Sequence, residues 1–538
     1  MRRRRAGRST SLLFVLLSAC ANPSSDGPEE TADNPAGAAA DKPKRDAGAG
    51  SSRAELDSGS SEPKHPDSGG AARDAAGDAR RPSVDAATST DTGSAPEDDA
   101  GSPTAGNSVQ MLPPALRDTG VIALFPPPMG RDLCPDPPLW LTFSGAPTLG
   151  TSGKVQVFDT EKPGTAVATV DLASNSVTDM RGGVTFSMER PAHVVGNAAV
   201  FYLPSRALSA GRSYFVRLDK GAVRGPLGTP AIDDDTSWSF STAKGSSSGD
   251  AKRKVALDGS GDFCSLQGAL DSISTGTIEI GRGTYHGIAY AKGKRDLTIR
   301  GADRKQTILS GTNNERMNSG TAKRSLIGID ASSGITFENL TIQNLTPQDG
   351  TQAEALRLQT CDRCIVRDAD ILSLQDTLLW SGRIYAQNCY IAGNVDFIWG
   401  TGAAYFDHCE IKTLGRGGYN VQSRNGASSY GYVFVDSKLT SDPGVTGNWL
   451  GRIDASSYPA SHVAYIDCEM GKHINPAGWQ VTGVDSGQLR FWEYRSKDPS
   501  GAAIDVSKRI AASKQLTEQT AAQMRDPSVV LGGWSPPP

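Results

Sequence analysis

Residues 368–411 read DADILSLQDTLLWSGRIYAQNCYIAGNVDFIWGTGAAYFDHCEI, and one short pattern occurs in this stretch three times. An Asp, Asn or His is followed three positions later by an isoleucine. The same pattern occurs before and after residues 368–411, where the residue at the third position is an aliphatic residue or Met. These apolar markers, at 342, 371, 391, 411, 439 and 470, are separated by 29, 20, 20, 28 and 31 residues. Such repeats, with short strand-like segments and few helix signals, predict a parallel β-helix. A propeller is the alternative, but its blades need about 40–50 residues each.

The same register places two acidic residues side by side. Asp376 lies five residues after Ile371, and Asp396 lies five residues after Ile391. Equivalent positions of neighbouring coils lie about 4.8 Å apart, so we expect the two carboxylates to stack. Two like charges that close do not both ionise readily, so one pKa should rise and the other stay low. Solvated aspartates at strand ends are the alternative interpretation.

The cysteines can be placed by the same arithmetic. Cys389 and Cys409 each lie two residues before a marker, which predicts a disulfide within the Cα–Cα window of about 4.4–6.8 Å. An exported location makes their oxidation plausible. For the C-x-x-C at 361–364, local pairing and free thiols both stay open. The sequence assigns no partner to Cys134, Cys264, Cys361, Cys364 and Cys468.

The N-terminus has the pattern of an export signal over residues 1–20. Arg2–Arg5 are followed by an apolar run and then by Leu17-Ser18-Ala19-Cys20, which resembles a bacterial lipoprotein signal with lipid attached to Cys20. Ala21 favours the outer membrane, and an ordinary secretory peptide is the alternative. The only long apolar run, Leu12–Ala19, is too short to span a bilayer, so membrane contact would be through the lipid alone. We therefore expect an exported bacterial outer-membrane or cell-surface lipoprotein, or else a secreted protein.

Residues 21–118 have the composition of a flexible linker. From Ala21 to Gln110 there is no Phe, Trp, Tyr, Ile or Met, and Ala, Ser, Gly, Asp and Pro dominate. Such a segment cannot bury enough apolar surface to offset its chain entropy. Residues 119–243 then carry short strand candidates of the kind found in a small β-sandwich: 140–143, 155–158, 199–203, 214–218 and 238–240. This stretch resembles bacterial immunoglobulin-like modules.

Charge and histidine content exclude several classes of function. The chain has 55 basic and 59 acidic residues, so it lacks the polybasic footprint of a nucleic-acid-binding protein. Its 6 histidines form no H-x-x-H or H-E-x-x-H pair, which argues against a histidine-built zinc site. We therefore expect neither a nucleic-acid partner nor a metal.

The segment 251–538 carries a set of ordered motifs. Gln375-Asp376-Thr377-Leu378 and Gly393-Asn394-Val395-Asp396-Phe397-Ile398-Trp399-Gly400 are two of them, and Leu450-Gly451-Arg452 is a third. With Gln352-Ala353-Glu354-Ala355-Leu356-Arg357 they resemble, in order, the motifs of the pectin methylesterases, or pectinesterases. The resemblance covers roughly residues 255–534. It implies an all-β fold, in which a right-handed parallel β-helix of the pectin lyase-like type follows the small sandwich along the chain.

The resemblance also implies roles for individual residues. Asp396 would be the nucleophile and Asp376 the general acid/base, without any cofactor. Arg452 would hold Asp396 ionised, and the amides of Gln352 and Gln375 would stabilise the oxyanion. Phe397 and Trp399 would either line the sugar groove or serve packing alone. The substrate would be pectin, a homogalacturonan, and the products would be methanol and free galacturonate, made by a monomeric enzyme.

One departure from the family pattern bears on the substrate. Ile453-Asp454 stands where the family usually has Pro-Trp, and that Trp commonly helps to form the sugar groove. Two other hypotheses therefore stay open beside the pectinesterase. One is an esterase or acyl thioesterase of the same fold that acts on a non-pectin substrate. The other is a non-catalytic carbohydrate-binding surface protein.

Overall fold

The computed structural model describes residues 112–245, 251–347 and 351–537. The predicted signal peptide, the lipidation of Cys20 and nearly all of the predicted linker lie outside these residues. Strands dominate the described part, whose helices are short: η1 (Pro114–Leu116), α1 (Leu266–Ser272), α2 (Glu518–Met524) and α3 (Pro527–Val530). None of the helices in this part is both long and apolar enough to cross a membrane.

Residues 121–242 form two main sheets around a shared apolar core. One sheet has the order β1 (Val121–Phe125), β3 (Leu139–Phe143), β10 (Ala198–Phe201), β9 (Ala192–Val195). The other has the order β2 (Gly130–Leu133), β13 (Ser239–Thr242), β11 (Ser213–Leu218), β5 (Lys154–Asp159), β6 (Lys162–Asp171). Phe143, Phe201 and Trp238 are fully buried between them. Each of the five predicted strand segments overlaps an observed strand, while the immunoglobulin-like resemblance stays a prediction.

Smaller strands complete this region. They are β4 (Thr148–Leu149) with β12 (Val223–Arg224), and the hairpin β7 (Ser176–Arg181) with β8 (Val184–Glu189). A disulfide joins Cys134 to Cys264 across a sequence separation of 130 residues. Next to it, Asp136 accepts hydrogen bonds from the backbone N–H of Cys264 at 2.7 Å and of Ser265 at 3.1 Å. Ser265 is also the N-cap of α1, so the start of the C-terminal domain is held covalently and by hydrogen bonds.

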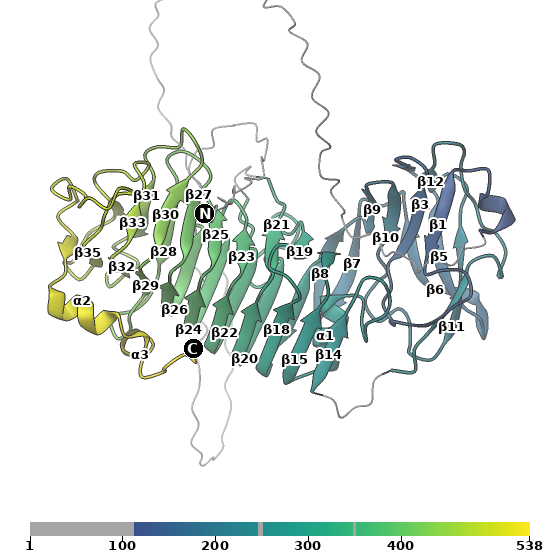
Figure 1. Cartoon of the computed structure of the whole chain (residues 1–538), viewed down its shortest axis with the longest axis horizontal. Helices are drawn as coiled ribbons and strands as arrows, with labels where there is room; N and C mark the ends of the chain where they lie inside the picture. Colours follow the sequence, from purple (N-terminus) through teal and green to yellow (C-terminus); the bar gives the residue numbers. More distant parts are fainter. Residues whose placement is uncertain (1–111, 246–250, 348–350, 538) are drawn as a thin grey trace, which may run out of the picture. The chain divides into compact units, whose positions relative to one another are not determined.

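The C-terminal domain is a parallel β-helix built from two long sheets (Figure 1). The path through the larger sheet is β14 (Lys252–Val255), β15 (Gly276–Ile280), β18 (Arg295–Gly301), β20 (Ile327–Glu338), β22 (Leu356–Arg367), β24 (Leu378–Gln387), β26 (Ile398–Asp407), β29 (Tyr432–Val435), β32 (His462–Ile466), β35 (Arg490–Tyr494), β36 (Ser513–Gln515). The second sheet is β16 (Gly283–His286), β19 (Thr307–Gly311), β21 (Thr341–Asn344), β23 (Asp370–Leu372), β25 (Tyr390–Gly393), β27 (Glu410–Thr413), β30 (Lys438–Ser441), β33 (Glu469–Met470). Four further strands extend the larger sheet: β17 (Ala289–Lys292), β28 (Tyr419–Ser423), β31 (Trp449–Asp454) and β34 (Trp479–Thr482). The all-β, solenoid prediction is confirmed.

The predicted apolar markers form one ladder inside the β-helix. Ile342 pairs with Ile371, and the ladder continues through Ile391, Ile411, Leu439 and Met470. The polar residue three positions before each marker has a positive φ of 48–56°: Asn339, Asp368, Asn388, His408, Asp436 and Asp467. Asn, Asp and His tolerate this left-handed conformation better than most residues. The repeat in the sequence is therefore a turn residue followed by an inward-pointing core residue.

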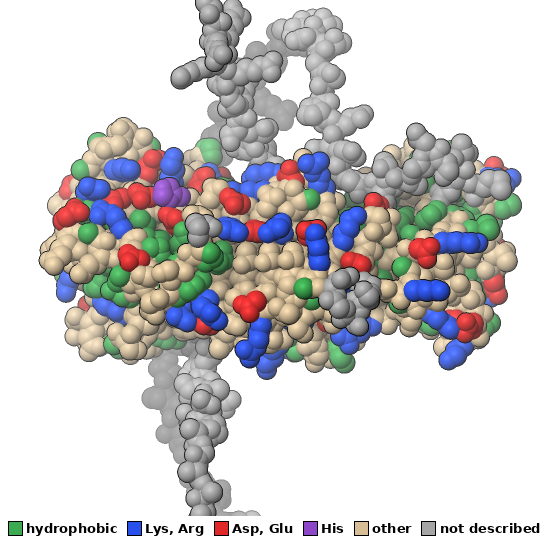
Figure 2. Space-filling model, turned by 60° about the horizontal axis from the view of Figure 1, so that its bottom comes forward, with side chains coloured by type: hydrophobic (Ala, Val, Ile, Leu, Met, Phe, Trp, Pro, Cys, Tyr) green, Lys and Arg blue, Asp and Glu red, His purple; other side chains and the backbone are tan. Residues whose placement is uncertain are grey.

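Aromatic rings stack along the interior of the domain. The ring centroids of Phe406 and Phe434 lie 4.3 Å apart, Trp380 lies 5.4 Å from Phe406, and Tyr465 lies 4.8 Å from Phe434. All four side chains are fully buried. Stacking at equivalent positions of successive coils lets each ring pack on the next, which adds to the apolar area that is buried. On the outside, acidic and basic side chains are interspersed over the face seen in Figure 2.

The predicted disulfide between Cys389 and Cys409 is wrong. Both thiols are free and buried, as is that of Cys468. Each Sγ contacts two backbone carbonyl oxygens, one two residues earlier in the chain and one in the preceding coil. For Cys389 they belong to Gln387 and Val366, both at 3.3 Å. The thiols therefore point in the same direction, as side chains in register on parallel strands do, and each contacts backbone carbonyls without forming a disulfide.

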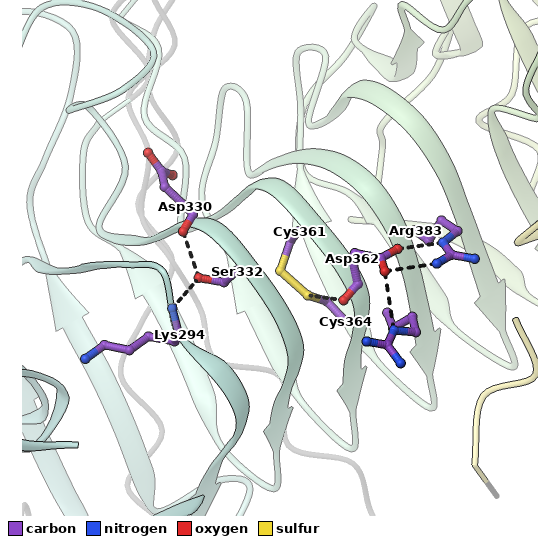
Figure 3. The surroundings of a disulfide bond; sticks show 8 residues. Lys294, Asp330, Ser332, Cys361, Asp362, Cys364 and Arg383 are labelled. Atoms are coloured by element: carbon purple, nitrogen blue, oxygen red, sulfur yellow. Dashed lines mark hydrogen bonds and ion pairs between the residues drawn. A yellow bond between two sulfur atoms is a disulfide. The ribbon is translucent and has the colours of Figure 1, made fainter. Parts of the chain in front are cut away.

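The C-x-x-C motif does pair locally. Cys361 is disulfide-bonded to Cys364 on β22 (Figure 3). Between them, Asp362 accepts hydrogen bonds from Arg383 of the next coil at 2.6 and 2.9 Å. Of the two possibilities that the sequence left open for this motif, the structure shows local pairing.

We expect alkylation of the denatured, unreduced protein to modify Cys389, Cys409 and Cys468 and to leave the four paired cysteines unmodified. Only free thiols react with an alkylating reagent, and denaturation removes the burial that protects these three. Peptide mass spectrometry after digestion is the measurement, and a sample reduced before alkylation is the control. A peptide in which Cys389 is linked to Cys409 would contradict this arrangement.

Candidate active site

Asp376 and Asp396 occupy equivalent positions in neighbouring coils. They lie on the turns that lead into β24 and β26, and these two strands pair in register. The residues before them, Gln375 and Val395, form a parallel bridge, so the register carries each aspartate onto the other. Both aspartates are buried, with exposed fractions of 7% and 5%. The structure thus brings together the two carboxylates that the coil length of 20 residues aligns.

Both aspartates have a left-handed backbone. The φ angle is 64° at Asp376 and 46° at Asp396. Few non-glycine residues adopt this conformation, and it is frequent at functional sites, where the surroundings hold a side chain in a required direction. The N–H of Asp376 donates to the carbonyl of Val395 at 3.0 Å, which ties the two turns together.

Arg452 on β31 binds Asp396. Its Nε donates to Oδ1 at 2.8 Å and to Oδ2 at 3.0 Å, and its Nη2 also donates to Oδ2. The guanidinium carbon lies 4.4 Å from the ring centroid of Tyr419, which supports it from one side. Burial opposes the charge on Arg452, but the bonds to Asp396 outweigh it and raise the pKa of Arg452. A guanidinium bound in this way stabilises the ionised form of a carboxylate and fixes its direction.

Asp376 has the opposite surroundings. Burial raises the pKa of Asp376 well above its usual range, and repulsion from Glu354 and Asp396 adds to this effect. Attraction to Arg324 and Arg424 opposes the rise without cancelling it. The site therefore places a carboxylate paired with a guanidinium beside a carboxyl group that favours its proton, an arrangement that suits a nucleophile and an acid.

Two residues of this cluster have no role in the sequence interpretation. Arg324 donates from Nη2 to Oδ2 of Asp376 at 3.0 Å, and from Nε to the carboxylate of Glu354 at 2.9 and 3.1 Å. Glu354 lies within a recognised motif, and its register offset from Asp376 could have identified it. Arg324 belongs to the irregular segment between β19 and β20, which has no periodicity from which its position could be deduced.

The pectinesterase family model matches residues 252–530, just over half of the chain. The chain belongs to the pectinesterase family. Pectinesterase 31 of Arabidopsis thaliana is 32% identical over 288 residues, which cover 50% of this chain and 88% of that protein. Probable pectinesterase 56 of the same plant is 34% identical over 244 residues, covering 42% and 83%. The solved structure of the pectin methylesterase from carrot is similar, with 27% identity and a TM-score of 0.44, over 54% of this chain and 95% of that one.

In this pectinesterase-family chain, Gln352 and Gln375 lie on turns beside the two aspartates. Gln375 directly precedes Asp376, and its carbonyl accepts from the N–H of Ala353 at 3.2 Å. Gln352 lies one coil earlier, and both side chains are half-buried. Neither side-chain amide is hydrogen-bonded to another residue of the described ranges. These amides are therefore available to a bound molecule.

Of the two roles that the sequence left open for Phe397, sugar groove or packing, the structure shows packing. Its side chain has no exposed surface and packs in the interior of the β-helix together with Ile398. The left-handed residue at Asp396 breaks the alternation of the strand, so that two consecutive side chains point inward. Trp399 lies on the other face, outside this core, beneath Arg424 and Arg324, whose guanidinium carbons are 4.7 and 5.5 Å from its ring.

Ile453 and Asp454, which replace Pro-Trp, do not contribute an aromatic surface. Ile453 is buried in the core, and Asp454 is exposed and accepts hydrogen bonds from Ser456 and Ser457. A different residue, Tyr458, lies half-buried with its ring 5.5 Å from the guanidinium carbon of Arg424. Arg424 thereby contacts the rings of both Trp399 and Tyr458.

Proposed function

We propose that this chain is a pectin methylesterase that hydrolyses the methyl esters of polygalacturonate to methanol and pectate. Its membership of the pectinesterase family supports the reaction class. The observation that carries the proposal at the level of the site is Asp396, held by Arg452, one coil away from a buried Asp376 whose pKa is raised by burial. Ester hydrolysis through a covalent intermediate needs this pair of groups.

In the first half of the reaction, an oxygen of the Asp396 carboxylate attacks the ester carbonyl carbon. The bond from that carbon to the methoxy oxygen then breaks, Asp376 gives its proton to the departing oxygen, and methanol leaves. The product on the enzyme is an anhydride between Asp396 and the galacturonate carboxyl group. The charge that develops on the carbonyl oxygen would be stabilised by the side-chain amides of Gln352 and Gln375.

In the second half, water attacks the anhydride. Asp376, now ionised, accepts a proton from that water, which restores its acid form. The galacturonate carboxyl group is released, and the Asp396 carboxylate returns to Arg452. Arg452 does not touch the leaving group in this scheme; it keeps Asp396 ionised and directed at the ester carbon. In this proposal Trp399 and Tyr458, with Arg424 between them, form part of the wall against which the sugar rings bind.

A second candidate function is an esterase or acyl thioesterase on a non-pectin substrate. The observation that favours it is the exposed Asp454, which stands where the family usually has the tryptophan of the sugar groove. The chemistry of the two aspartates would be the same, because a thioester carbonyl accepts the same nucleophile. Only the leaving group and the surrounding groove would differ.

The test is methanol release from methyl-esterified polygalacturonate by the wild-type protein, compared with hydrolysis of acyl thioesters. We expect methanol release at a rate typical of an enzyme, about 1–10³ s⁻¹. Thioester cleavage without methanol release would overturn the proposed pectin methylesterase function in favour of the second candidate function. Binding to pectin with no turnover of either substrate would favour a carbohydrate-binding protein.

We further propose that the chain is exported and anchored through Cys20 as a monomeric lipoprotein. The lipoprotein-like residues 17–20 support the anchor, and the two disulfides among the described residues support an oxidising compartment. Metabolic labelling with a radioactive fatty acid tests the anchor: label should enter the wild type and not the Cys20→Ser variant.

A further inference from the structure

We propose that Glu354 and Arg324 are positioning residues that set whether Asp376 carries a proton, and through it the pH range in which the esterase works. The inference rests on the proposed function and extends it to two residues that do not touch the ester. It concerns a buried acid–guanidinium–acid arrangement (Glu354, Arg324 and Asp376) behind the reacting pair.

The three groups are placed by three different coils. Glu354 precedes β22, Asp376 precedes β24, and Arg324 comes from the segment before β20. Because Leu356 pairs with Leu378, Glu354 and Asp376 occupy equivalent positions of adjacent coils. The side chains of Glu354, Arg324 and Asp376 have exposed fractions of 0%, 8% and 9%. Water therefore screens their interactions weakly, and each charge strongly affects the other two.

One guanidinium serves both buried acids. Arg324 donates Nε to both oxygens of Glu354 and Nη2 to Asp376. Its remaining Nη1 donates at 3.1 Å to Glu315, whose side chain is 32% exposed. Burial opposes the charge on Arg324, but attraction to Glu354 and Asp376 exceeds that penalty and raises the pKa of Arg324. The arginine therefore stays cationic while two buried acids compete for it.

The other charged groups that face Asp376 are already engaged. Asp396 is bound by Arg452, so that this pair is close to neutral. Arg424 donates to the side-chain oxygen of Gln422 at 3.0 and 2.7 Å and stacks on Trp399. Arg324 donates a hydrogen bond to Asp376, and the carboxylate of Glu354, bound to the same guanidinium, offsets its charge.

The direction of each effect follows from these charges. A cation at hydrogen-bond distance lowers the pKa of a carboxyl group by about 1–3 units when nothing offsets it. Burial raises the pKa of Glu354 as well, and attraction to Arg324 opposes that rise. Once ionised, Glu354 neutralises Arg324 and repels a charge on Asp376, so Asp376 keeps its proton to higher pH. Removing the charge of Glu354 should therefore make Asp376 more acidic, and removing the charge of Arg324 should make it less acidic.

The experiment is the pH profile of kcat/KM for methanol release by the wild type and three variants. In the proposed mechanism the rising limb reports ionisation of Asp396, and the falling limb reports loss of the proton of Asp376. We expect Glu354→Gln to move the falling limb about one pH unit or more to lower pH. Arg324→Gln should move it to higher pH, and Arg324→Lys, which keeps the charge, should move it back toward the wild type.

Glu315→Gln is the matched control. It removes a carboxylate from the same guanidinium, but at a partly exposed position where solvent screens the charge, so the limb should move by less than about 0.3 pH units. If Glu354→Gln lowers kcat with both limbs unmoved, the residue is merely structural and the inference is overturned. If the two arginine variants do not fold, the Glu354→Gln variant alone tests the inference: a falling limb at lower pH supports it, and a limb that is unmoved or at higher pH overturns it.

Failure of the proposed function gives a different result. In that case the wild type releases no methanol, and the protonation of Asp376 is followed directly. The carboxyl ¹³C signals of protein labelled at aspartate are titrated, with Asp376→Asn used to assign the signal. A lower titration midpoint for Asp376 in Glu354→Gln supports the inference, and an unchanged midpoint overturns it.

Discussion

Asp396→Asn is expected to lower kcat for methanol release by about 10⁴-fold or more, the scale seen when a nucleophile that works as a unit with its partners is removed. An amide is a far weaker nucleophile than a carboxylate, so the anhydride intermediate cannot form at a useful rate. The substitution keeps the size of the side chain, and its oxygen can still accept a hydrogen bond from Arg452. The loss should therefore appear in kcat, with little change in KM.

The measurement is the initial rate of methanol release at saturating methyl-esterified polygalacturonate. Asp436→Asn is a matched control, because Asp436 is an exposed aspartate that also has a left-handed backbone, with a φ of 48°. Its kcat should stay within about two-fold of the wild type, as is usual for a surface substitution. If Asp396→Asn keeps more than a tenth of the wild-type kcat, Asp396 does not act as the nucleophile.

Phe406→Ala is expected to destabilise the protein by about 3–5 kcal/mol, the usual range for an aromatic residue truncated in a well-packed core. Phe406 has no exposed surface, and its ring stacks between Trp380 and Phe434 at centroid distances of 5.4 and 4.3 Å. A third ring, that of Tyr432, meets it edge-on at 6.0 Å. Removing the ring leaves a cavity whose lining is held in place by the coils on either side.

Equilibrium unfolding in urea, followed by tryptophan fluorescence, measures this change in the free energy of unfolding. Val484→Ala is the control, since Val484 is 77% exposed and its truncation should change the free energy by no more than about 0.5 kcal/mol. Equal unfolding midpoints for Phe406→Ala and the wild type would show that the aromatic stack adds nothing to the stability of the β-helix.

The repeat of a turn residue and a core residue could be identified from the sequence because both properties are local. A left-handed turn favours Asn, Asp or His, and the interior of a coil favours Ile, Leu or Met three positions later. Coil length then determines register, which is why the alignment of Asp376 with Asp396 follows from a spacing of 20 residues. The Arg452 contact, 56 residues from Asp396, came from the family resemblance instead.

Register defines where a Cα lies and leaves the direction of the side chain undetermined. Cys389 and Cys409 are adjacent as predicted, yet their thiols point the same way and stay free. For Phe397 the sequence left the groove and the core both open, and the left-handed residue before it turns its ring into the core. The causes differ: side chains in register on parallel strands point the same way, which keeps the thiols apart, whereas at Phe397 a left-handed turn interrupts the alternation from which side-chain direction is deduced.

The chain by itself determined the coil repeat, the pairing of the two aspartates and the family, since these depend on residues at regular spacing. Only the tertiary structure decided which buried groups surround Asp376. Arg324 lies 52 residues before Asp376 in the sequence, in an irregular segment, and its one guanidinium binds both Glu354 and Asp376. Contacts of this kind depend on how an aperiodic loop packs against the finished coils, and a protonation state depends on the sum of the charges assembled there.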